Sequence, residues 1–153
     1  MAKDLPGIFY TGPLDERWQI TRHPSEDPAW EFQLDISDDG APAGHVLLRH
    51  TLTGRLQEAY PVGARDLEVE PHMEDPAALQ AATHWIFQDD TACRRVVLAT
   101  AAEDIPAIDF GERAGYRYVV DVEIAGDVEL SLLAAEPEWV LKEPRAIETR
   151  AGH

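Results

Sequence analysis

Apolar and polar residues alternate along the first half of the chain, which is typical of strands with one buried face. In WEFQLDI, residues 30–36, every second residue is apolar. The segment SDDGAPAG has the composition of a turn and HVLLRHTL resumes an extended run, so we predict an antiparallel hairpin over residues 30–52. Alternation also predicts an earlier strand at residues 18–23 and a later one at 64–71, while residues 55–63 form a short strand or a loop.

The second half predicts two helices separated by a buried strand. In MEDPAALQAATHWIFQDD, acidic side chains and Pro76 occupy the first helical turn, and apolar residues then recur at helical spacing. CRRVVLAT, residues 93–100, is the near-continuous apolar run of a strand covered on both faces. A second helix is predicted over residues 102–116, ending at Gly115, and residues 117–134 predict a closing hairpin.

This order of elements predicts an α+β fold with a mixed, mostly antiparallel sheet and two main helices. The length of 153 residues suits one domain. We therefore expect a single domain over residues 1–153, with an irregular lead-in at 1–16 and a C-terminal tail at 136–153. Trp139 is the one aromatic residue of that tail, and it is a candidate to hold the tail against the domain.

Charge and cysteine content exclude several classes of protein. The chain has 29 acidic and 13 basic side chains, and a net charge of -16 repels nucleic acid and anionic membrane surfaces. The single cysteine, Cys93, cannot form an intramolecular disulfide, and no run reaches the roughly 20 apolar residues of a membrane span. The N-terminus lacks the apolar core of a signal peptide, so we predict a cytoplasmic protein. Abundant arginine and alanine without asparagine suggest a GC-rich bacterial genome.

The run RRVVLATAAEDIPAIDFGERAGYRYVVDVEI resembles the C-terminal half of the GNAT superfamily of N-acetyltransferases. In that family a strand leads into a helix that ends in a Gly-Phe or Gly-Tyr pair, here Gly115 and Tyr116. The resemblance covers residues 64–134, and residues 30–50 match the family's central hairpin. DLEVEPHMEDPAALQAATHWIF resembles the subgroup that acylates hydroxylamine or lysine-type amines in siderophore biosynthesis. The N-terminal part leaves no room for the family's first two helices, so these are expected to be reduced or missing.

The resemblance implies an acyl-CoA-dependent N-acyltransferase (acetyltransferase) acting on a small amine, with acetyl-CoA or another acyl-CoA as cofactor. In the family a strand backbone N–H polarises the thioester carbonyl, and the diphosphate of coenzyme A sits on free N–H groups at the next helix. The corresponding positions here are Val69 and Pro71 on the strand, Ala77 and Ala78 at the first helix, and Asp104 at the second.

The chain departs from the family where the diphosphate binds. The family's glycine-rich turn is replaced by HMEDPAA, which brings the carboxylates Glu74 and Asp75 and the donor-free Pro76. Gly111 and Ala101 stand where a tyrosine and an aspartate of the family are expected. The alternative is therefore a catalytically inactive GNAT-fold protein that binds a protein partner or a small ligand, and a homodimer is among the assemblies that it allows.

The candidate catalytic residues are His72, Glu70 and Glu68, at the end of the predicted strand 64–71. A histidine with an ordinary pKa near 6.5 suits a general base, although His72 is also consistent with a surface-loop histidine. Glu68 and Glu70 either point into the cleft, where a glutamate can act as base through water, or form the solvated face of the strand. We identify no metal site, because His45 and His50 have opposite parity on one strand.

Four arginines are expected to form a basic cluster, whose positive charge could offset the phosphates of coenzyme A: Arg94, Arg95, Arg113 and Arg117. Cys93 precedes the buried strand beside two of these arginines. A lowered thiol pKa is conceivable there, whereas a plain structural cysteine is the alternative.

Overall fold

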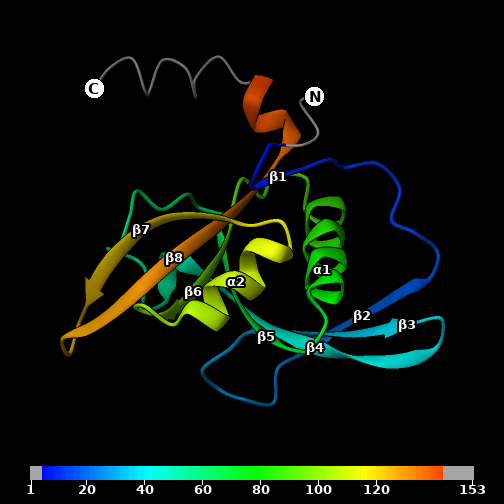
Figure 1. Ribbon diagram of the computed structural model, residues 1–153, viewed down its shortest axis with the longest axis horizontal. Coiled ribbons are helices and arrows are strands. Elements are labelled where there is room, and N and C mark those ends of the chain that lie inside the picture. The colour runs from blue at the N-terminus through cyan, green and yellow to red at the C-terminus, as the bar shows by residue number, and fades with distance from the viewer. Residues whose placement is uncertain (1–4, 143–153) are drawn as a thin grey trace.

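The computed structural model describes residues 5–142, and eight strands form one sheet in the order β1-β8-β6-β5-β4-β3-β2, with β7 also paired to β8 (Figure 1). The strands are β1 (Ile8–Phe9), β2 (Trp18–Pro24), β3 (Phe32–Asp38), β4 (Ala41–His50), β5 (Leu67–His72), β6 (Val96–Ala101), β7 (Arg117–Ile124) and β8 (Val128–Pro137). Only the β5–β6 and β1–β8 pairs are parallel within the described chain. The predicted mixed, mostly antiparallel α+β sheet is confirmed.

The predicted hairpin is formed by β3 and β4. The turn between them contains Asp39 and Gly40, both with positive φ, and an Asp-Gly pair adopts this left-handed backbone at little cost. Gly44 on β4 also has a positive φ, and a Cβ at that position would lie 2.5 Å from the carbonyl oxygen of His72. Glycine therefore allows β4 to approach the end of β5 closely, which positions the strand that carries the candidate site.

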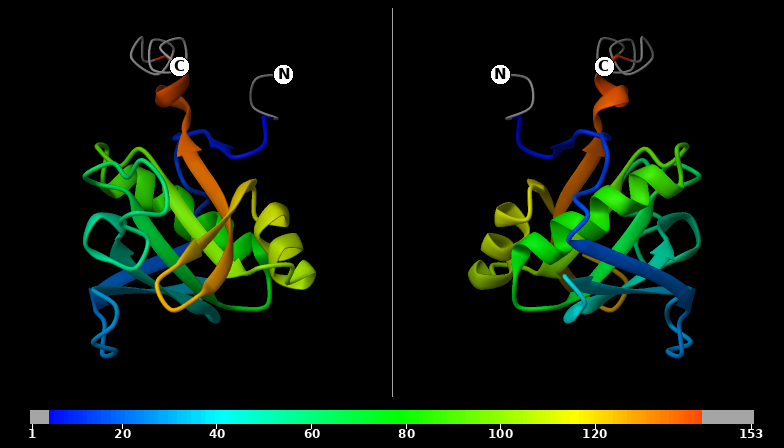
Figure 2. Two further views of the ribbon diagram at one scale, coloured as in Figure 1. Left: turned by 90° about the vertical axis from the view of Figure 1, so that its left-hand side faces the viewer. Right: turned by 90° about the vertical axis from the view of Figure 1, so that its right-hand side faces the viewer.

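The helices α1 (Pro76–Asp89) and α2 (Ile105–Arg113) lie on the same face of the sheet, as Figure 1 and Figure 2 show. On α1, Leu79, Ala82 and Ile86 recur at helical spacing and are buried in the main core. The side chains that they meet come from alternate positions of the strands, including Leu34, Val46, Val69 and Leu98. The helical and strand periodicities of the sequence therefore converge on one core.

The opposite face of the sheet carries no α-helix among residues 5–142. Residues 25–31 are all that separate β2 from β3, which confirms that the first-half helices are missing. Part of this face is covered by the segment between β4 and β5, residues 51–66, which contains a 3-10 turn at Thr51–Thr53. Its Leu56 is fully buried against alternate residues of β6 and β8: Val97, Leu130 and Leu132.

The strands β5 and β6 pair over only three positions, from Leu67–Val96 to Val69–Leu98. Beyond Val69 they diverge, while β5 continues along β4 as far as His72. Val96 and Val97, which point to opposite faces, are both buried, so the prediction that this strand is covered on both faces is confirmed. The divergence opens the sheet next to α2.

The structure corrects two details at the ends of the chain. The expected irregular lead-in contains β1, which pairs parallel to Glu136 and Pro137, and these residues of the expected tail still belong to β8. Trp139 lies in a following 3-10 turn, where the Arg94 guanidinium stacks over its ring at 5.5 Å. The remaining positions of the tail, residues 143–153, lie outside the described residues. No helix of residues 5–142 is long and apolar enough to cross a membrane.

Candidate functional site

A cavity of about 300 Å³ lies where β5 and β6 diverge. It is lined by Pro71, Met73, Leu98, Ala99, Thr100, Ala101, Asp104, Ala107 and Phe110. Among these lining residues, Asp104 carries the one charged side chain. It caps α2 by accepting a hydrogen bond from the Ala107 N–H at 3.2 Å. The lining residues are therefore mostly apolar, and we call this cavity the cleft.

The N-terminus of α1 is capped by the chain's own carboxylate. The Asp75 Oδ1 atom accepts a hydrogen bond from the Ala77 N–H at 2.9 Å, and the Asp75 carbonyl accepts one from the Ala78 N–H at 3.0 Å. Pro76, the first helical residue, has no N–H to offer. The two N–H groups predicted to bind cofactor, those of Ala77 and Ala78, are thus already hydrogen-bonded within the chain.

His72 and Glu70 form a pair on the face of β5 that points away from the helices. Their Nε2 and Oε2 atoms lie 2.9 Å apart, and the side chains are 45% and 47% exposed. A carboxylate acceptor favours the proton on Nε2, which leaves Nδ1 of a neutral His72 as the free basic nitrogen. The structure therefore brings together two of the three predicted catalytic residues in an arrangement suited to proton transfer.

The third predicted catalytic residue, Glu68, is held apart from this pair. Its side chain is 1% exposed and lies between two guanidinium groups, with 3.0 Å to Arg49 Nε and 2.8 Å to Arg55 Nη2. Arg55 belongs to the covering segment 51–66. Glu68 accordingly ties that segment to β4 and β5, and a carboxylate engaged in this way is not available as a base in the cleft.

Val69 and Pro71 alternate with these acidic residues and point toward the helices. Val69 is buried in the core, whereas Pro71 lines the cleft. Proline has no backbone N–H, so Pro71 cannot donate to a developing oxyanion. Any backbone donor on this strand must come from a neighbouring residue.

The strand register adds three polar residues that sequence reasoning did not place at the site. His45 of β4 lies between Asp35 of β3 and His72 of β5, and its ring stacks on His72 at 4.6 Å. His23 of β2 binds Asp35, with 2.8 Å between Nε2 and Oδ2. The signal was present as alternate polar positions on each strand, but only the register shows that they are neighbours. We call His23, Asp35, His45, Glu70 and His72 the polar row.

The environments of the histidines in the polar row differ. Burial lowers the pKa of the His45 imidazole, and the neighbouring His72 lowers it further. The hydrogen bond to Asp35 raises the pKa of His23. Within residues 5–142, no group of three or more His, Cys, Asp and Glu side chains has the geometry to hold a metal ion.

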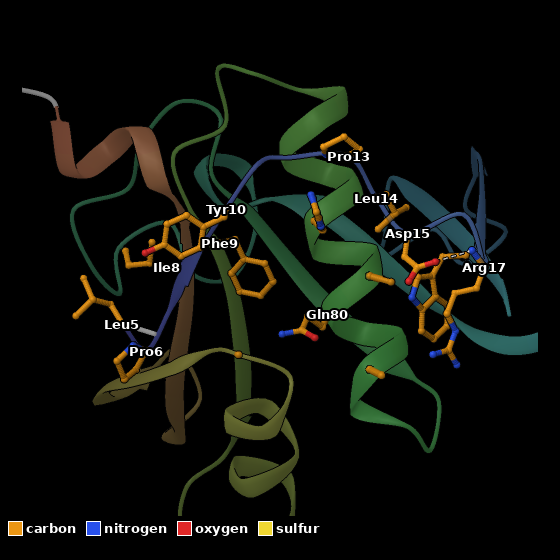
Figure 3. Close-up of a pocket in the computed structure, with 15 residues that line it drawn as sticks. Leu5, Pro6, Ile8, Phe9, Tyr10, Pro13, Leu14, Asp15, Arg17 and Gln80 are labelled. Atoms are coloured by element: carbon orange, nitrogen blue, oxygen red, sulfur yellow. Dashed lines mark hydrogen bonds between the residues drawn. The ribbon is translucent and has the colours of Figure 1, made fainter. Parts of the chain in front are cut away.

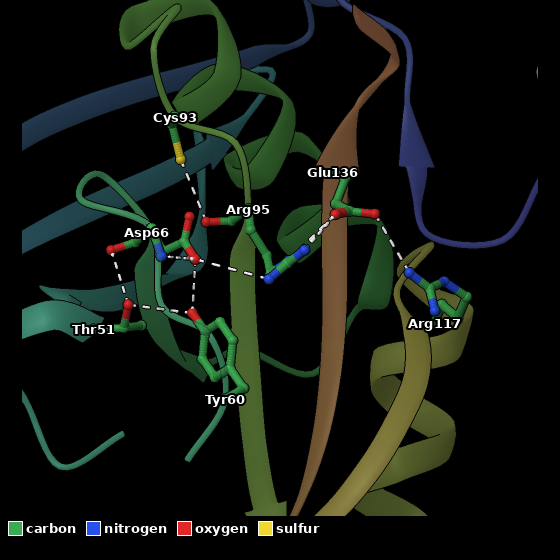
Figure 4. Close-up of polar contacts among 8 residues, drawn as sticks. Thr51, Tyr60, Asp66, Cys93, Arg95, Arg117 and Glu136 are labelled. Atoms are coloured by element: carbon green, nitrogen blue, oxygen red, sulfur yellow. Dashed lines mark hydrogen bonds and ion pairs between the residues drawn. The ribbon is translucent and has the colours of Figure 1, made fainter. Parts of the chain in front are cut away.

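The four arginines predicted to form a basic cluster are divided among several partners. Arg95 and Arg117 both bind Glu136, at 2.9 and 3.4 Å, and Arg95 also approaches Asp66 (Figure 4). Arg113 lies 4.0 Å from Asp109 on α2, and Arg94 stacks on Trp139. None of the four lines the cleft. The expectation that all four form one basic cluster for phosphates is wrong, because Arg95 and Arg117 share a partner, whereas Arg94 and Arg113 lie against other residues.

Cys93 is buried, and its environment agrees with the structural alternative. Burial raises the pKa of the thiol to about 12, so the reactive thiolate is disfavoured at neutral pH. Its Sγ atom lies 3.4 Å from the Arg95 carbonyl oxygen, at the edge of the network in Figure 4.

A second, larger cavity of about 630 Å³ lies between α1 and the N-terminal segment that leads from β1 to β2 (Figure 3). Phe9 of β1 and Gln80 of α1 face this space, and Arg17 lies at its far end. Trp18 also lines the cavity. The segment is tied to α1 by His84, whose Nε2 lies 2.6 Å from the Gly12 carbonyl oxygen. This cavity contains none of the predicted site residues except Ala77.

Comparison with solved structures identifies the fold. An uncharacterized protein from Bacillus halodurans superposes with a TM-score of 0.59 at 16% identity, and the alignment covers 72% of this chain and 61% of that protein. The aminoglycoside acetyltransferase AAC(6')-Ib, in complex with coenzyme A and kanamycin, superposes with a TM-score of 0.59 at 11% identity over 72% of this chain and 69% of the enzyme. The chain has a GNAT-like fold.

At these identities the likeness extends to the GNAT-like fold alone. The chain spans 61% of the Bacillus halodurans protein. Another structure of AAC(6')-Ib, with ribostamycin and coenzyme A, superposes equally well, with a TM-score of 0.59 at 12% identity over 74% of this chain and 68% of the enzyme. Neither a protein-family model nor a curated protein sequence matches the chain. The GNAT-like framework is therefore established from the structure, and the chemistry must be argued from the site.

Proposed function

We propose that this protein is an acyltransferase that passes an acyl group from a thioester in the cleft to a small amine on the polar row. The observation that carries the proposal is the position of the His72–Glu70 pair. It lies on β5, the strand that borders the cleft, with no helix of residues 5–142 covering it. An amine on this face and a thioester in the cleft would meet through the gap where β5 and β6 diverge.

The reaction joins the amine nitrogen to the thioester carbonyl carbon and breaks the carbon–sulfur bond. In this proposal Nδ1 of His72 accepts the proton that the amine loses, and Glu70 holds the ring through Nε2 and stabilises the resulting imidazolium. The departing thiolate takes up a proton, so charge and atoms balance.

The acceptor chemistry follows from the charge of the polar row. Asp35 and Glu70 place two carboxylates on this face, and the whole chain has a net charge of -16, so a cationic or polar amine is favoured over an anionic one. The resemblance of residues 66–87 to acyltransferases of siderophore biosynthesis makes lysine-type amines and hydroxylamines the first acceptors to test. Aminoglycosides form a second class, because AAC(6')-Ib is seen with kanamycin.

A second function is favoured by one specific observation. The carboxylate of Asp75 occupies the start of α1, where the GNAT resemblance places the diphosphate of coenzyme A. The residues present do not fit that group. A catalytically inactive protein that uses the open face to bind a small ligand or a protein partner is the alternative that this mismatch supports.

Acyl transfer is tested by release of free thiol from acetyl thioesters in the presence of the amines above. We expect His72→Ala to lower kcat by about 10²- to 10⁴-fold, the usual contribution of a general base, while thioester binding is unchanged. Glu70→Gln lowers kcat less, because it removes only the group that orients the ring. The control is His50→Ala, a histidine of the same strand pair that binds Glu31 away from the cleft. Absence of turnover with every thioester and amine would favour the inactive alternative.

A further inference from the structure

The geometry points to an acyl donor without a diphosphate. A neutral, phosphate-free thioester arm fits the cleft, and the nucleotide part of coenzyme A adds no binding affinity. This inference rests on the proposed acyl transfer. Its basis is that the N–H groups of Ala77 and Ala78 are already hydrogen-bonded within the chain and that no lysine or arginine lines the cleft.

The hydrogen-bond donors at the start of α1 are already used within the chain. A helix N-terminus binds phosphate through N–H groups that have no partner within the helix. At α1, Pro76 has no N–H, and the N–H groups of Ala77 and Ala78 are both used: Ala77 donates to Asp75 Oδ1 at 2.9 Å and Ala78 donates to the Asp75 carbonyl at 3.0 Å. A diphosphate would have to displace the Asp75 carboxylate, which is covalently tethered at the same position.

The charges at the start of α1 also oppose a diphosphate. Glu74 and Asp75 are both exposed at the start of α1, so each carboxylate would face a bound phosphate and repel it. Compensation would have to come from lysine or arginine, and neither lines the cleft. Two arginines of the expected basic cluster, Arg95 and Arg117, are instead held by Glu136. The local field thus opposes an anionic donor.

The lining of the cleft favours an uncharged arm of the donor. Its apolar walls are formed by Pro71, Met73, Leu98 and Phe110, with three alanines, Thr100 and the helix-capping Asp104 between them. A cavity of about 300 Å³ with this lining suits a slender uncharged chain, such as the amide-containing arm that carries the thioester sulfur in pantetheine. Binding energy for the donor comes from this arm and the acyl group.

The experiment measures binding of two unreactive donor analogues by calorimetry: the S-ethyl thioether of pantetheine and the S-ethyl thioether of coenzyme A. We expect the pantetheine thioether to bind at least as tightly as the coenzyme A thioether. The double variant Glu74→Gln/Asp75→Asn keeps the helix cap, because asparagine also caps helices, and removes both charges. It should tighten binding of the coenzyme A thioether by about fivefold or more and leave the pantetheine thioether within about twofold.

The matched control is Glu26→Gln/Glu58→Gln, which removes two exposed carboxylates that do not line the cleft. It should leave both affinities unchanged, which separates the local charge at α1 from the net charge of the chain. Added salt should favour the coenzyme A thioether in the wild-type protein, since repulsion is screened.

The outcomes are distinguishable from those of the proposed function. Tenfold tighter binding of the coenzyme A thioether to the wild-type protein overturns the inference and leaves acyl transfer intact. Failure of both thioethers to bind overturns it as well, because the cleft then does not hold the arm. Binding of the pantetheine thioether without turnover of any thioester supports the inference about the cleft and overturns the proposed acyl transfer instead.

Discussion

The sheet face opposite the helices has two unlike halves. On β2 to β5 it presents the polar row, open on its outer side, with pairs such as His23–Asp35 and His72–Glu70. On β6 and β8 it is apolar and covered by the segment 51–66 through Leu56. Alternation in a strand decides which residues share a face, whereas the connections between strands decide whether that face is buried. Here a single connection divides one face into a core and a candidate site.

Glu68 marks the boundary between these halves. It lies on the same face of β5 as Glu70 and His72, yet it is buried by Arg49 of β4 and Arg55 of the covering segment. Carboxylates two residues apart thus have different roles, because one lies beneath the segment 51–66 and the other beyond it. Substitutions in the covered half, at the boundary and in the polar row should therefore have different effects.

The largest effect is expected from Leu56→Ala in the covered half. Leu56 is 0% exposed, and its removal leaves a cavity over Val97, Leu130 and Leu132. Such changes cost about 2–5 kcal/mol of unfolding free energy, measured here by urea denaturation. The control is Leu52→Ala in the same segment, where the side chain is 48% exposed and a change within about 0.5 kcal/mol is expected. Equal stability of the two variants would show that the segment does not hold the apolar half.

A smaller loss is expected from Glu68→Gln at the boundary. The variant leaves two guanidinium groups without their carboxylate, but both keep some contact with water, so we expect a loss of about 1–3 kcal/mol. Glu70→Gln, two residues further on and half exposed, should change the unfolding free energy by less than about 0.5 kcal/mol. The comparison fails if both glutamate variants unfold at the same urea concentration.

The order of elements was predictable because each has a strong local pattern. The helix that begins at Pro76 and the strand through Val96 and Val97 follow from a first-turn proline and from a continuous apolar run. The short strand β1 was not predictable, since two residues carry no periodicity, and it forms only because the end of β8 is available to pair with it. Tertiary context, rather than local preference, creates it.

The candidate site was predictable only in part for the same reason. His72 and Glu70 are two residues apart, so their proximity on one strand face follows from sequence. His45 and Asp35 join them through the register of three strands, which sequence does not specify. The arginines are the converse case: Arg94 and Arg95 are adjacent in sequence, but Arg94 stacks on Trp139 whereas Arg95 binds Glu136.

A third prediction concerns the far end of the covering segment. The Tyr60 hydroxyl lies 2.9 Å from Asp66 Oδ2 and 3.2 Å from Thr51 Oγ1, and Asp66 is almost fully buried (Figure 4). Tyr60→Phe removes a donor to a buried carboxylate and should cost about 1 kcal/mol in urea unfolding. The control is Tyr118→Phe. The Tyr118 hydroxyl binds the exposed Asp121, so its removal should cost less unfolding free energy. An equal or larger loss in Tyr118→Phe would contradict the buried network.

The smallest effect on stability is expected in the polar row, where Asp35→Asn should act mainly on histidine ionisation. In the wild-type protein, NMR titration should place the pKa of His23 above 6.5, because Asp35 binds it, and that of His45 below 6.5, because it is partly buried and faces His72. Asp35→Asn should lower the pKa of both, since the Asp35 charge also favours protonated His45. The His45 pKa should remain the lower of the two, because burial is its largest cause.

These shifts have opposite consequences for stability. The raised pKa of His23 stabilises the fold at pH below 6.5, and that contribution is lost as pH rises through the folded pKa. The lowered pKa of His45 favours the fold above pH 6.5, and that contribution is lost as pH falls through the folded pKa. His50→Ala, which leaves the polar row intact, should not move either pKa. Equal pKa values near 6.5 for His23 and His45 in the wild-type protein would contradict this prediction. The side chains of the polar row would then not interact, and the open half of the face would be an ordinary solvated surface.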